Sequence, residues 1–264
     1  MRKVKIRRIK QIFLAGVIIG ILAGILFTML VANTVITKKE AQHKEVTNNL
    51  TKNNEELSLQ VSKNEAAHNN AKVLAGNEDG WALALVNEAH PLDTSYVPAE
   101  LVEIESERSV DSRIAEPLKK MLDDGAAAGL DMYVTSAYRD YEYQRTVFNA
   151  TMNDWIGQGY KPLDAYDETR KSVAVPGTSE HATGLAVDII SADYKALDDR
   201  QGDTDEQKWL MEHCWEYGFI LRYPQDKADV TGIIFEPWHY RYVGEAAAKE
   251  IHEQGLTLEE YLQQ

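Results

Sequence analysis

The chain has 264 residues, a formal net charge of −14 and one cysteine, Cys214. The phosphate backbone of nucleic acids repels so acidic a protein, so the composition argues against a nucleic-acid partner. A single cysteine excludes an intrachain disulfide, and we expect Cys214 to be a small buried side chain in its apolar, helix-like surroundings.

The N-terminus begins with a basic segment that is followed by an apolar one. Residues 1–10 hold six Lys or Arg and no acid, and residues 12–32 form an uncharged apolar run of 21 residues. Such a run reaches the ~30 Å of a bilayer core, whereas the apolar part of a cleaved signal peptide has only about 7–15 residues. We therefore predict a cytoplasmic segment at residues 1–10 and a transmembrane signal anchor at residues 11–32, with the remaining chain outside the membrane.

Residues 33–79 are polar, rich in Asn, Lys and Glu, and contain no Trp, Tyr or Phe. Because they lack the apolar side chains for a core, we predict an extracytoplasmic stalk that is flexible or partly helical. All five Trp and all thirteen Tyr follow residue 79. We place one folded domain at residues 80–264, which is long enough to bury a core of its own.

Apolar spacing and turn residues outline the elements of this domain. Helices are predicted at residues 115–129, 141–155, 204–217, 245–254 and 258–262, with Thr204 and Gln207 as a capping pair. Strands are predicted at residues 131–138, 184–190, 219–222 and 233–243, and loops at residues 176–183 and 198–205. Because strands and helices do not alternate regularly, we predict an α+β fold with a small, largely antiparallel sheet flanked by helices.

Two short segments offer ligands for a metal ion. His181 in a loop and Asp188 in the following strand stand seven residues apart, and His239 comes from a second strand. Zinc takes imidazole nitrogen and carboxylate oxygen, and three such ligands leave a position open for water. Glu236, three residues before His239, is close enough to move the proton of that water without being a ligand. Together the four residues predict hydrolysis by metal-activated water.

A single His or Asp is seldom a metal ligand, so the prediction rests on all four residues together. Two histidines and a carboxylate also form the facial triad of non-haem iron oxygenases, where the first two ligands usually stand two positions apart. The separation of seven residues here argues against that chemistry.

The pattern Ser-x-His-x-x-Gly-x-Ala-x-Asp at residues 179–188, followed by Glu-x-Trp-His-x-Arg-Tyr at residues 236–242, resembles the zinc D-alanyl-D-alanine carboxypeptidases of the VanY type. This group also contains L,D-carboxypeptidases and D-Ala-D-Ala dipeptidases, and the similarity covers most of residues 81–264. The resemblance implies a fold shared with hedgehog-type domains. It also implies one Zn²⁺ per chain on His181, Asp188 and His239, with Glu236 as general base.

Arg139 is a candidate for the substrate side of the site. A guanidinium group binds a terminal carboxylate through two parallel hydrogen bonds, or stabilises the oxyanion of a tetrahedral intermediate. A surface ion pair with Asp140 or Glu142 is the alternative. The resemblance places Arg139 and Gln144 in the substrate pocket and implies that Ser179 faces the substrate.

Alternation along the last strand separates its side chains into two sets. Trp238 and Tyr240 should point away from the face of His239 and contribute to the core, whereas Arg241 shares the face of His239. Arg241 then either orients Glu236 or Asp188, or forms an ordinary ion pair.

The resemblance implies a single-pass protein of a bacterial cell membrane that removes the C-terminal D-alanine from peptidoglycan stem peptides. An L,D-carboxypeptidase acting on tetrapeptide stems uses the same chemistry, and these residues do not distinguish the two. Outside the enzymes, a non-catalytic zinc-containing wall-binding module is the alternative, and Glu236 argues against it because a silent domain needs no base. An endopeptidase or a dipeptidase fits less well, and the oligomeric state stays open.

Overall fold

The computed structural model describes residues 2–75 and 80–263, and the chain divides into two compact units, Met1–Gln60 and Val61–Gln264. The predicted boundary between stalk and domain adjoins residues 76–79, which lie outside the described residues. The helices of eight or more residues are α1 (Arg2–Ala75), α2 (Ser112–Ala127), α3 (Tyr141–Gly157), α4 (Pro162–Thr169), α5 (Asp205–His213) and α7 (Glu245–Gln254). Two shorter ones are α6 (Ala228–Thr231) and α8 (Leu258–Tyr261).

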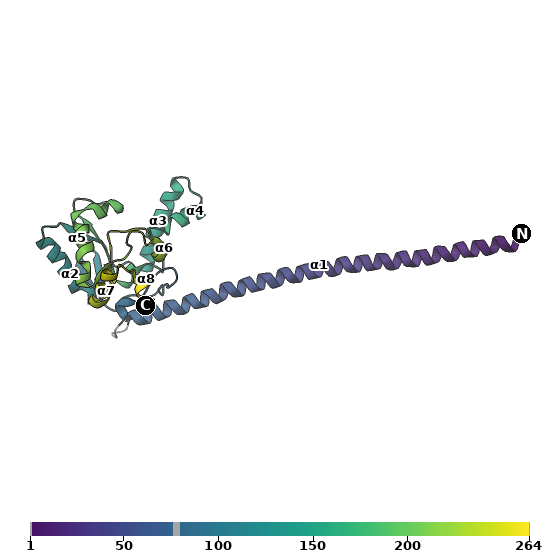
Figure 1. Cartoon of the computed structure of the whole chain (residues 1–264), viewed down its shortest axis with the longest axis horizontal. Coiled ribbons are helices and arrows are strands. Elements are labelled where there is room, and N and C mark those ends of the chain that lie inside the picture. Colours follow the sequence, from purple (N-terminus) through teal and green to yellow (C-terminus); the bar gives the residue numbers. More distant parts are fainter. Residues whose placement is uncertain (1, 76–79, 264) are drawn as a thin grey trace. The chain divides into compact units, whose positions relative to one another are not determined.

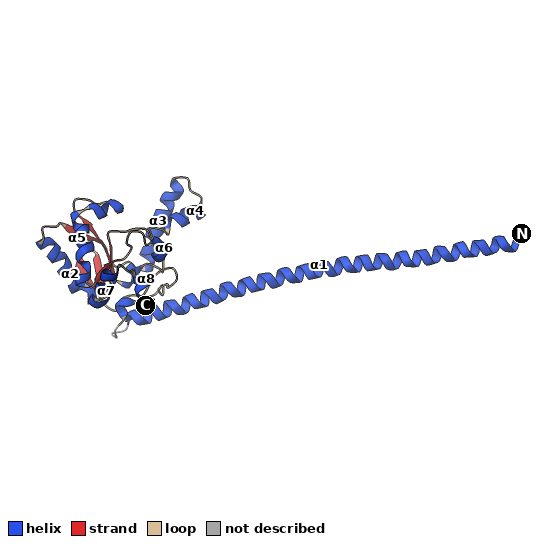
Figure 2. Ribbon diagram, viewed as in Figure 1, coloured by secondary structure: helices blue, strands red, loops and turns tan. Residues whose placement is uncertain are grey.

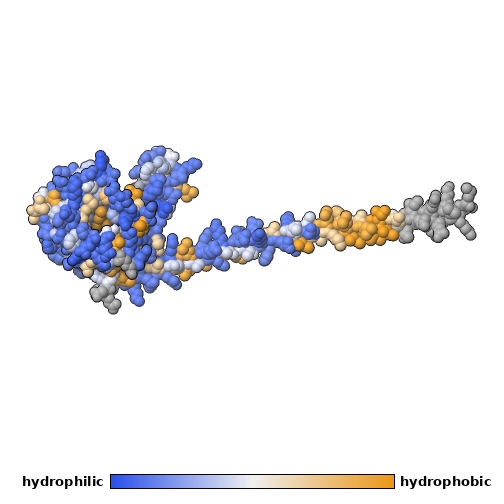
Figure 3. Space-filling view, viewed as in Figure 1, coloured by the Kyte–Doolittle hydropathy of each residue, from blue (hydrophilic) through white to orange (hydrophobic). Residues whose placement is uncertain are grey.

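The first unit consists of α1 alone. Within the described residues, α1 is the one helix long and apolar enough to cross a membrane by length and composition, with a mean hydropathy of 2.6 in its most apolar window. Figure 3 shows a hydrophobic band along this helix, followed by a mostly hydrophilic stretch. The predicted stalk is helical as far as Ala75, because residues 33–75 contain no Pro or Gly to interrupt a helix.

The second unit is built on a four-stranded antiparallel sheet in the order β3-β4-β6-β5. Its strands are β3 (Met132–Ser136), β4 (Ala186–Ser191), β5 (Phe219–Leu221) and β6 (His239–Tyr242), and β1 (Leu101–Glu105) and β2 (Arg108–Asp111) form a separate hairpin. Helices α2, α5 and α7 surround the strands (Figure 2), and α3 and α4 pack on each other (Figure 1). The predicted α+β class with a small antiparallel sheet flanked by helices is confirmed.

Strand β4 runs through the centre of the sheet and fixes the position of the site. All six of its residues are buried, as expected for a strand covered on both faces. Its one charged residue, Asp188, is aligned with Ser136 on β3 and with His239 on β6. The register of the sheet therefore sets the Asp188 carboxylate beside the His239 ring.

Helix α2 supplies much of the core that supports the sheet. The side chain of Asp111 caps its N-terminus by accepting a hydrogen bond from the backbone N–H of Arg113, and Leu118 and Met121 are fully buried. Leu74, which precedes the predicted start of the domain at residue 80, belongs to the same apolar cluster. The last turns of α1 thus contribute to the core of the second unit.

Several predicted elements need correction. The strand predicted at residues 233–243 is present only as β6, because residues 233–238 form a loop in which Glu236 N–H donates to Tyr223 O and Pro237 has no N–H to donate. The helix predicted at residues 204–217 becomes a 3₁₀ helix after His213, although Thr204 caps it as predicted. Both predicted loops contain a short 3₁₀ helix, η2 (Glu180–Thr183) and η3 (Asp199–Asp203). The β1–β2 hairpin and α4 were not predicted.

Candidate metal centre

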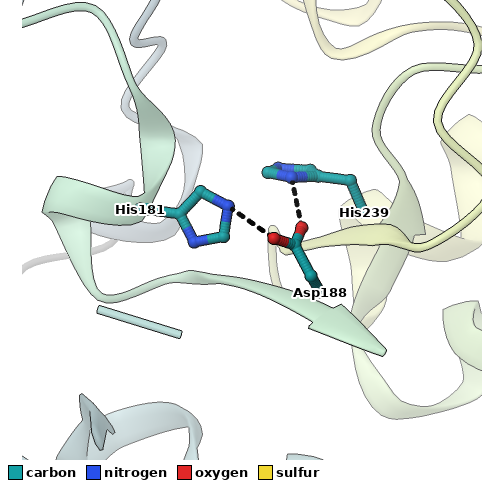
Figure 4. Close-up of side chains that lie close together, drawn as sticks. All are labelled: His181, Asp188 and His239. Atoms are coloured by element: carbon teal, nitrogen blue, oxygen red, sulfur yellow. Dashed lines mark hydrogen bonds and ion pairs between the residues drawn. The ribbon is translucent and has the colours of Figure 1, made fainter. Parts of the chain in front are cut away.

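Three elements bring the predicted ligands together. His181 lies on η2, Asp188 on β4 and His239 at the start of β6, and one ligand atom from each lies within 4.8 Å of the others. All three residues are buried, with exposed fractions of 2% to 4%. Figure 4 shows both imidazole rings pointing toward the Asp188 carboxylate, with a dashed line from each ring to a different carboxylate oxygen.

Hydrogen bonds show which ring atoms are available for a metal. His181 Nδ1 lies 2.7 Å from the carbonyl oxygen of Ala137, which can only accept a hydrogen bond, so Nδ1 carries the proton. His181 Nε2 lies 3.3 Å from Asp188 Oδ2, and His239 Nδ1 lies 3.0 Å from Asp188 Oδ1. One nitrogen of each ring and the carboxylate thus face a common point, which fits the donor set of a catalytic zinc.

The electrostatics of the cluster follow from burial and close opposite charges. Burial, together with the charge of Arg139, lowers the pKa of His181 to about 4, so this ring is neutral at pH 7. Burial acts to raise the pKa of Asp188, but the two histidines outweigh it and hold that pKa well below its usual range. Burial acts to lower the pKa of His239, but the nearby carboxylates of Asp188 and Glu180 outweigh it and raise that pKa to about 9. A neutral His181 and an ionised Asp188 are the forms that bind a metal.

Glu236 lies in the loop that precedes β6. Its Oε2 is 3.9 Å from His239 Nδ1, and its side chain is only 8% exposed. Burial raises the pKa of Glu236 to about 8, and the negative charge of Asp188 adds to the effect. A carboxyl with such a pKa exchanges a proton near neutral pH, which is the property of a general acid–base group.

The cluster lies against a cavity of about 730 Å³. Among the described residues, the lining includes Arg139, Ser179 and Glu236 but not Gln144. Gln144 is 1% exposed; its Oε1 accepts a hydrogen bond from Arg139 Nε at 3.1 Å, and its Nε2 donates to Ala174 O at 2.8 Å. Gln144 therefore holds the Arg139 guanidinium beside the cavity, where Arg139 Nη1 lies 3.8 Å from Asp188 Oδ2.

The alternation predicted for the last strand holds for Tyr240 but not for Trp238, which precedes β6 and lines the same cavity as His239. Tyr240 is fully buried in the core, and Trp238, which is 8% exposed, also lines the cavity. Among the described residues, Arg241 forms no hydrogen bond or ion pair with Glu236 or Asp188. Instead, its Nη1 donates to Glu180 Oε1 at 2.8 Å. Of the two predicted roles for Arg241, the ion pair is the one observed.

Sequence reasoning missed Glu180 and Arg222. Both are fully buried, and Arg222 Nε donates to Glu180 Oε1 at 2.8 Å. Glu180 is adjacent to His181 in the chain, but Arg222 is 42 residues away, and no spacing in the sequence connects the two. Burial acts to raise the pKa of Glu180, but Arg222 and Arg241 outweigh it and keep the group ionised.

A buried pair of histidines and a carboxylate, with a second carboxylate and an arginine beside an open cavity, is typical of a metal-dependent hydrolase. The model of the family "VanY: D-alanyl-D-alanine carboxypeptidase" matches residues 107–245, a range that contains all of these side chains. The chain belongs to this family and is a peptidase.

Relatives agree with this assignment. A D-alanyl-D-alanine carboxypeptidase of Enterococcus faecalis is 41% identical over 187 residues, which are 71% of this chain and 68% of that protein. A structure of a variant of the vancomycin-resistance D,D-pentapeptidase VanY in complex with Zn(II) is 40% identical, with a TM-score of 0.63 over 69% of this chain and 99% of the other. The LD-carboxypeptidase LdcB is 35% identical, with a TM-score of 0.61 over 72% of this chain and 92% of the other.

Proposed function

We propose that this chain is a zinc-dependent D-alanyl-D-alanine carboxypeptidase that removes the C-terminal D-alanine from peptidoglycan stem peptides. The observation that carries the proposal is the convergence of His181, Asp188 and His239 at a cavity that Glu236 and Arg139 also line. His181 would hold one zinc ion through Nε2, His239 through Nδ1 and Asp188 through its carboxylate. A zinc ion bound there supplies a Lewis acid that lowers the pKa of a water molecule and polarises a carbonyl group.

Glu236 is the general base and acid of the proposed reaction. Its buried carboxylate lies at the cavity wall, 3.9 Å from the ring of a ligand, so it is near the attacking water. Glu236 takes the proton of that water as the oxygen attacks the penultimate carbonyl carbon. It then returns the proton to the amine of the departing D-alanine, so that the proton is conserved.

Arg139 stabilises the negative oxygen that forms at the attacked carbonyl. Its Nη1 is 3.8 Å from Asp188 Oδ2, which places the guanidinium beside the cluster rather than at the far end of the cavity. Gln144 and Ser136 hold it there through hydrogen bonds of 3.1 and 3.0 Å. A donor that is already oriented costs no rearrangement when charge develops. Ser179, which lines the cavity, faces the substrate in this proposal.

The N-terminal segment supports a location at the cell membrane. The apolar part of α1 is proposed as a single transmembrane span at residues 11–32, with the basic residues 1–10 in the cytoplasm. Residues 33–79 then act as a stalk between the bilayer and the catalytic domain at residues 80–264. This arrangement keeps the site at the outer face of the cell membrane, where stem peptides are found.

An L,D-carboxypeptidase acting on tetrapeptide stems is the second candidate. The similarity to LdcB, which covers 92% of that chain, supports it. The two activities differ in the chirality of the residue before the cut, so a substrate pair that differs only there distinguishes them.

The substitution Glu236→Gln tests the proposal. The amide keeps the shape of the side chain but cannot accept the proton, so we expect hydrolysis of a D-Ala-D-Ala peptide to fall by about 10²- to 10⁴-fold. Zinc content should stay at one ion per chain, because Glu236 is not a ligand. Glu116→Gln on the exposed face of α2 is the matched control for the loss of one charge. Hydrolysis at the wild-type rate by the Glu236 variant would show that another group is the base.

A further inference from the structure

Two buried polar atoms face each other beside the cluster without a hydrogen-bond partner. They are Glu180 Oε2 and His239 Nε2, which lie 3.7 Å apart. Among the described residues, only one other buried side-chain nitrogen or oxygen, the hydroxyl of Tyr96, has no partner. Buried polar groups nearly always have a hydrogen-bond partner, so two unpaired groups that face each other call for a functional explanation.

The Glu180 carboxylate is fixed from its opposite side. Its Oε1 accepts two hydrogen bonds of 2.8 Å, from Arg222 Nε and from Arg241 Nη1. Arg241 Nη2 is in turn fixed by the carbonyl oxygens of Ala82 and Ala84, at 2.9 and 2.8 Å. Oε1 is thereby fully used, and Oε2 is the oxygen that remains for the histidine.

The cluster of buried charges is balanced. Besides its single bond to Glu180, Arg222 donates a pair of hydrogen bonds to Glu259, at 2.6 and 2.9 Å, so two arginines face two carboxylates. All four side chains are 0% to 7% exposed. Glu180 and Glu259 are therefore equivalent in charge and burial, but only Glu180 faces His239.

The orientation of the His239 ring links its contact with Glu180 to its tautomer. His239 Nδ1 faces Asp188 and the common point of the cluster, so His239 can bind a metal only through a deprotonated Nδ1. The neutral ring must then carry its proton on Nε2. A carboxylate facing Nε2 accepts that proton in a hydrogen bond and stabilises this tautomer over the other. An approach of about 0.5 Å is enough to bring the 3.7 Å separation to hydrogen-bond length.

We propose that Glu180 is a positioning residue that orients His239 and selects its metal-binding tautomer by accepting a hydrogen bond from Nε2. This inference rests on the proposed function, since it assigns His239 to the metal. Through Glu180, the proposed metal ligands are also connected to two other parts of the fold. Arg222 connects Glu180 to Glu259 on α8, and Arg241 connects it to the backbone at Ala82 and Ala84.

The substitution Glu180→Gln separates this role from a structural one. The amide has one oxygen, so it cannot accept hydrogen bonds from the two arginines on one side and from His239 Nε2 on the other. Its NH₂ group then faces either the histidine or the arginines, and both of these are donors. We expect zinc affinity to fall by about ten- to a hundredfold. Glu259→Gln removes the same charge from the same cluster without touching His239, and we expect it to leave zinc affinity unchanged.

Zinc affinity is measured on the full chain in detergent, by competition with a chromophoric chelator, together with the thermal stability of each variant without metal. The inference is supported if both variants lose the same thermal stability but only the Glu180 variant loses zinc affinity. Equal zinc affinities in both variants overturn it. Failure of the wild-type chain to bind zinc at all would instead overturn the proposed metal site.

A measurement on the wild-type chain keeps the test independent of whether a variant folds. Nitrogen-15 spectra of the zinc-loaded protein report which nitrogen of His239 carries the proton. The inference expects a protonated Nε2 in a hydrogen bond, with its resonance shifted in the Glu180→Gln variant and unshifted in the Glu259→Gln variant. A His239 ring protonated on Nδ1 in the zinc-loaded protein would overturn it.

Discussion

Alanine at position 184 would place a methyl group against the backbone of the β1–β2 hairpin. Gly184 ends η2, the turn that carries His181, and its φ of +73° lies in the left-handed region that favours glycine. An added Cβ would lie 2.9 Å from the backbone nitrogen of Asp111 and 3.2 Å from Pro98 Cγ. The same Asp111 N–H donates to Gly184 O at 3.0 Å, so the two backbones cannot separate without losing that bond.

The cost of Gly184→Ala has two parts. The left-handed conformation costs a residue with a Cβ about 1–2 kcal/mol, and forcing a methyl group into a packed site costs about 1–3 kcal/mol more. A total of about 3 kcal/mol lowers the melting temperature of a domain of this size by roughly 6–12 °C. Zinc affinity should fall as well, because η2 and β4 carry two of the proposed ligands.

Gly255→Ala is the matched control. Gly255 ends α7 with a φ of +65°, but an added Cβ there has no atom within 4 Å. Only the conformational cost of about 1–2 kcal/mol applies, so we expect a smaller decrease of roughly 2–8 °C. Differential scanning calorimetry of the full chain in detergent compares the two variants. Equal decreases in melting temperature would refute the argument from close approach.

Three further outcomes are expected. Arg139→Lys should lower kcat/KM by about 10- to 100-fold through kcat, because an ammonium group does not reproduce the oriented guanidinium; a change confined to KM would show that Arg139 binds the terminal carboxylate instead. Burial raises the pKa of Cys214 to about 12, so the reactive thiolate is scarce below that pH. Iodoacetamide at pH 8 should therefore label the chain only after denaturation, and rapid labelling of the folded chain would contradict this. Deletion of residues 2–32 should move the protein from the membrane fraction to the soluble fraction, and a variant that stays with membranes would place the anchor elsewhere.

The convergence of the predicted ligands could be expected from the sequence. His181 and Asp188 belong to one short motif, and the pairing of β4 with β6 then aligns Asp188 with His239. The loop that holds Glu236 could also have been found, because Pro237 falls inside the predicted strand and argues against strand structure there. The Pro at position 162 is likewise a common first residue of a helix, and it begins α4.

Other features had no local signal. The β1–β2 hairpin turns at Glu107, a non-glycine residue with a φ of 63°, where no Asn-Gly or Asp-Gly pair marks a turn. The charge cluster around Glu180 joins residues that are 42 and 61 positions away, and only the folded sheet brings Arg222 and Arg241 to that carboxylate. Long-range contacts of this kind depend on the tertiary structure, which the spacing of residues does not encode.

The central claim is metal-dependent removal of one terminal D-alanine. The most direct test incubates the full chain with two synthetic stem peptides, one ending in D-Ala-D-Ala and one in L-Lys-D-Ala, with a chelator, without it, and after zinc is restored. Mass spectrometry of the products should show the loss of one alanine from the D-Ala-D-Ala peptide, abolished by the chelator and recovered with zinc. Cleavage that persists after the metal is removed, or no cleavage of either peptide by the zinc-loaded protein, would contradict the account.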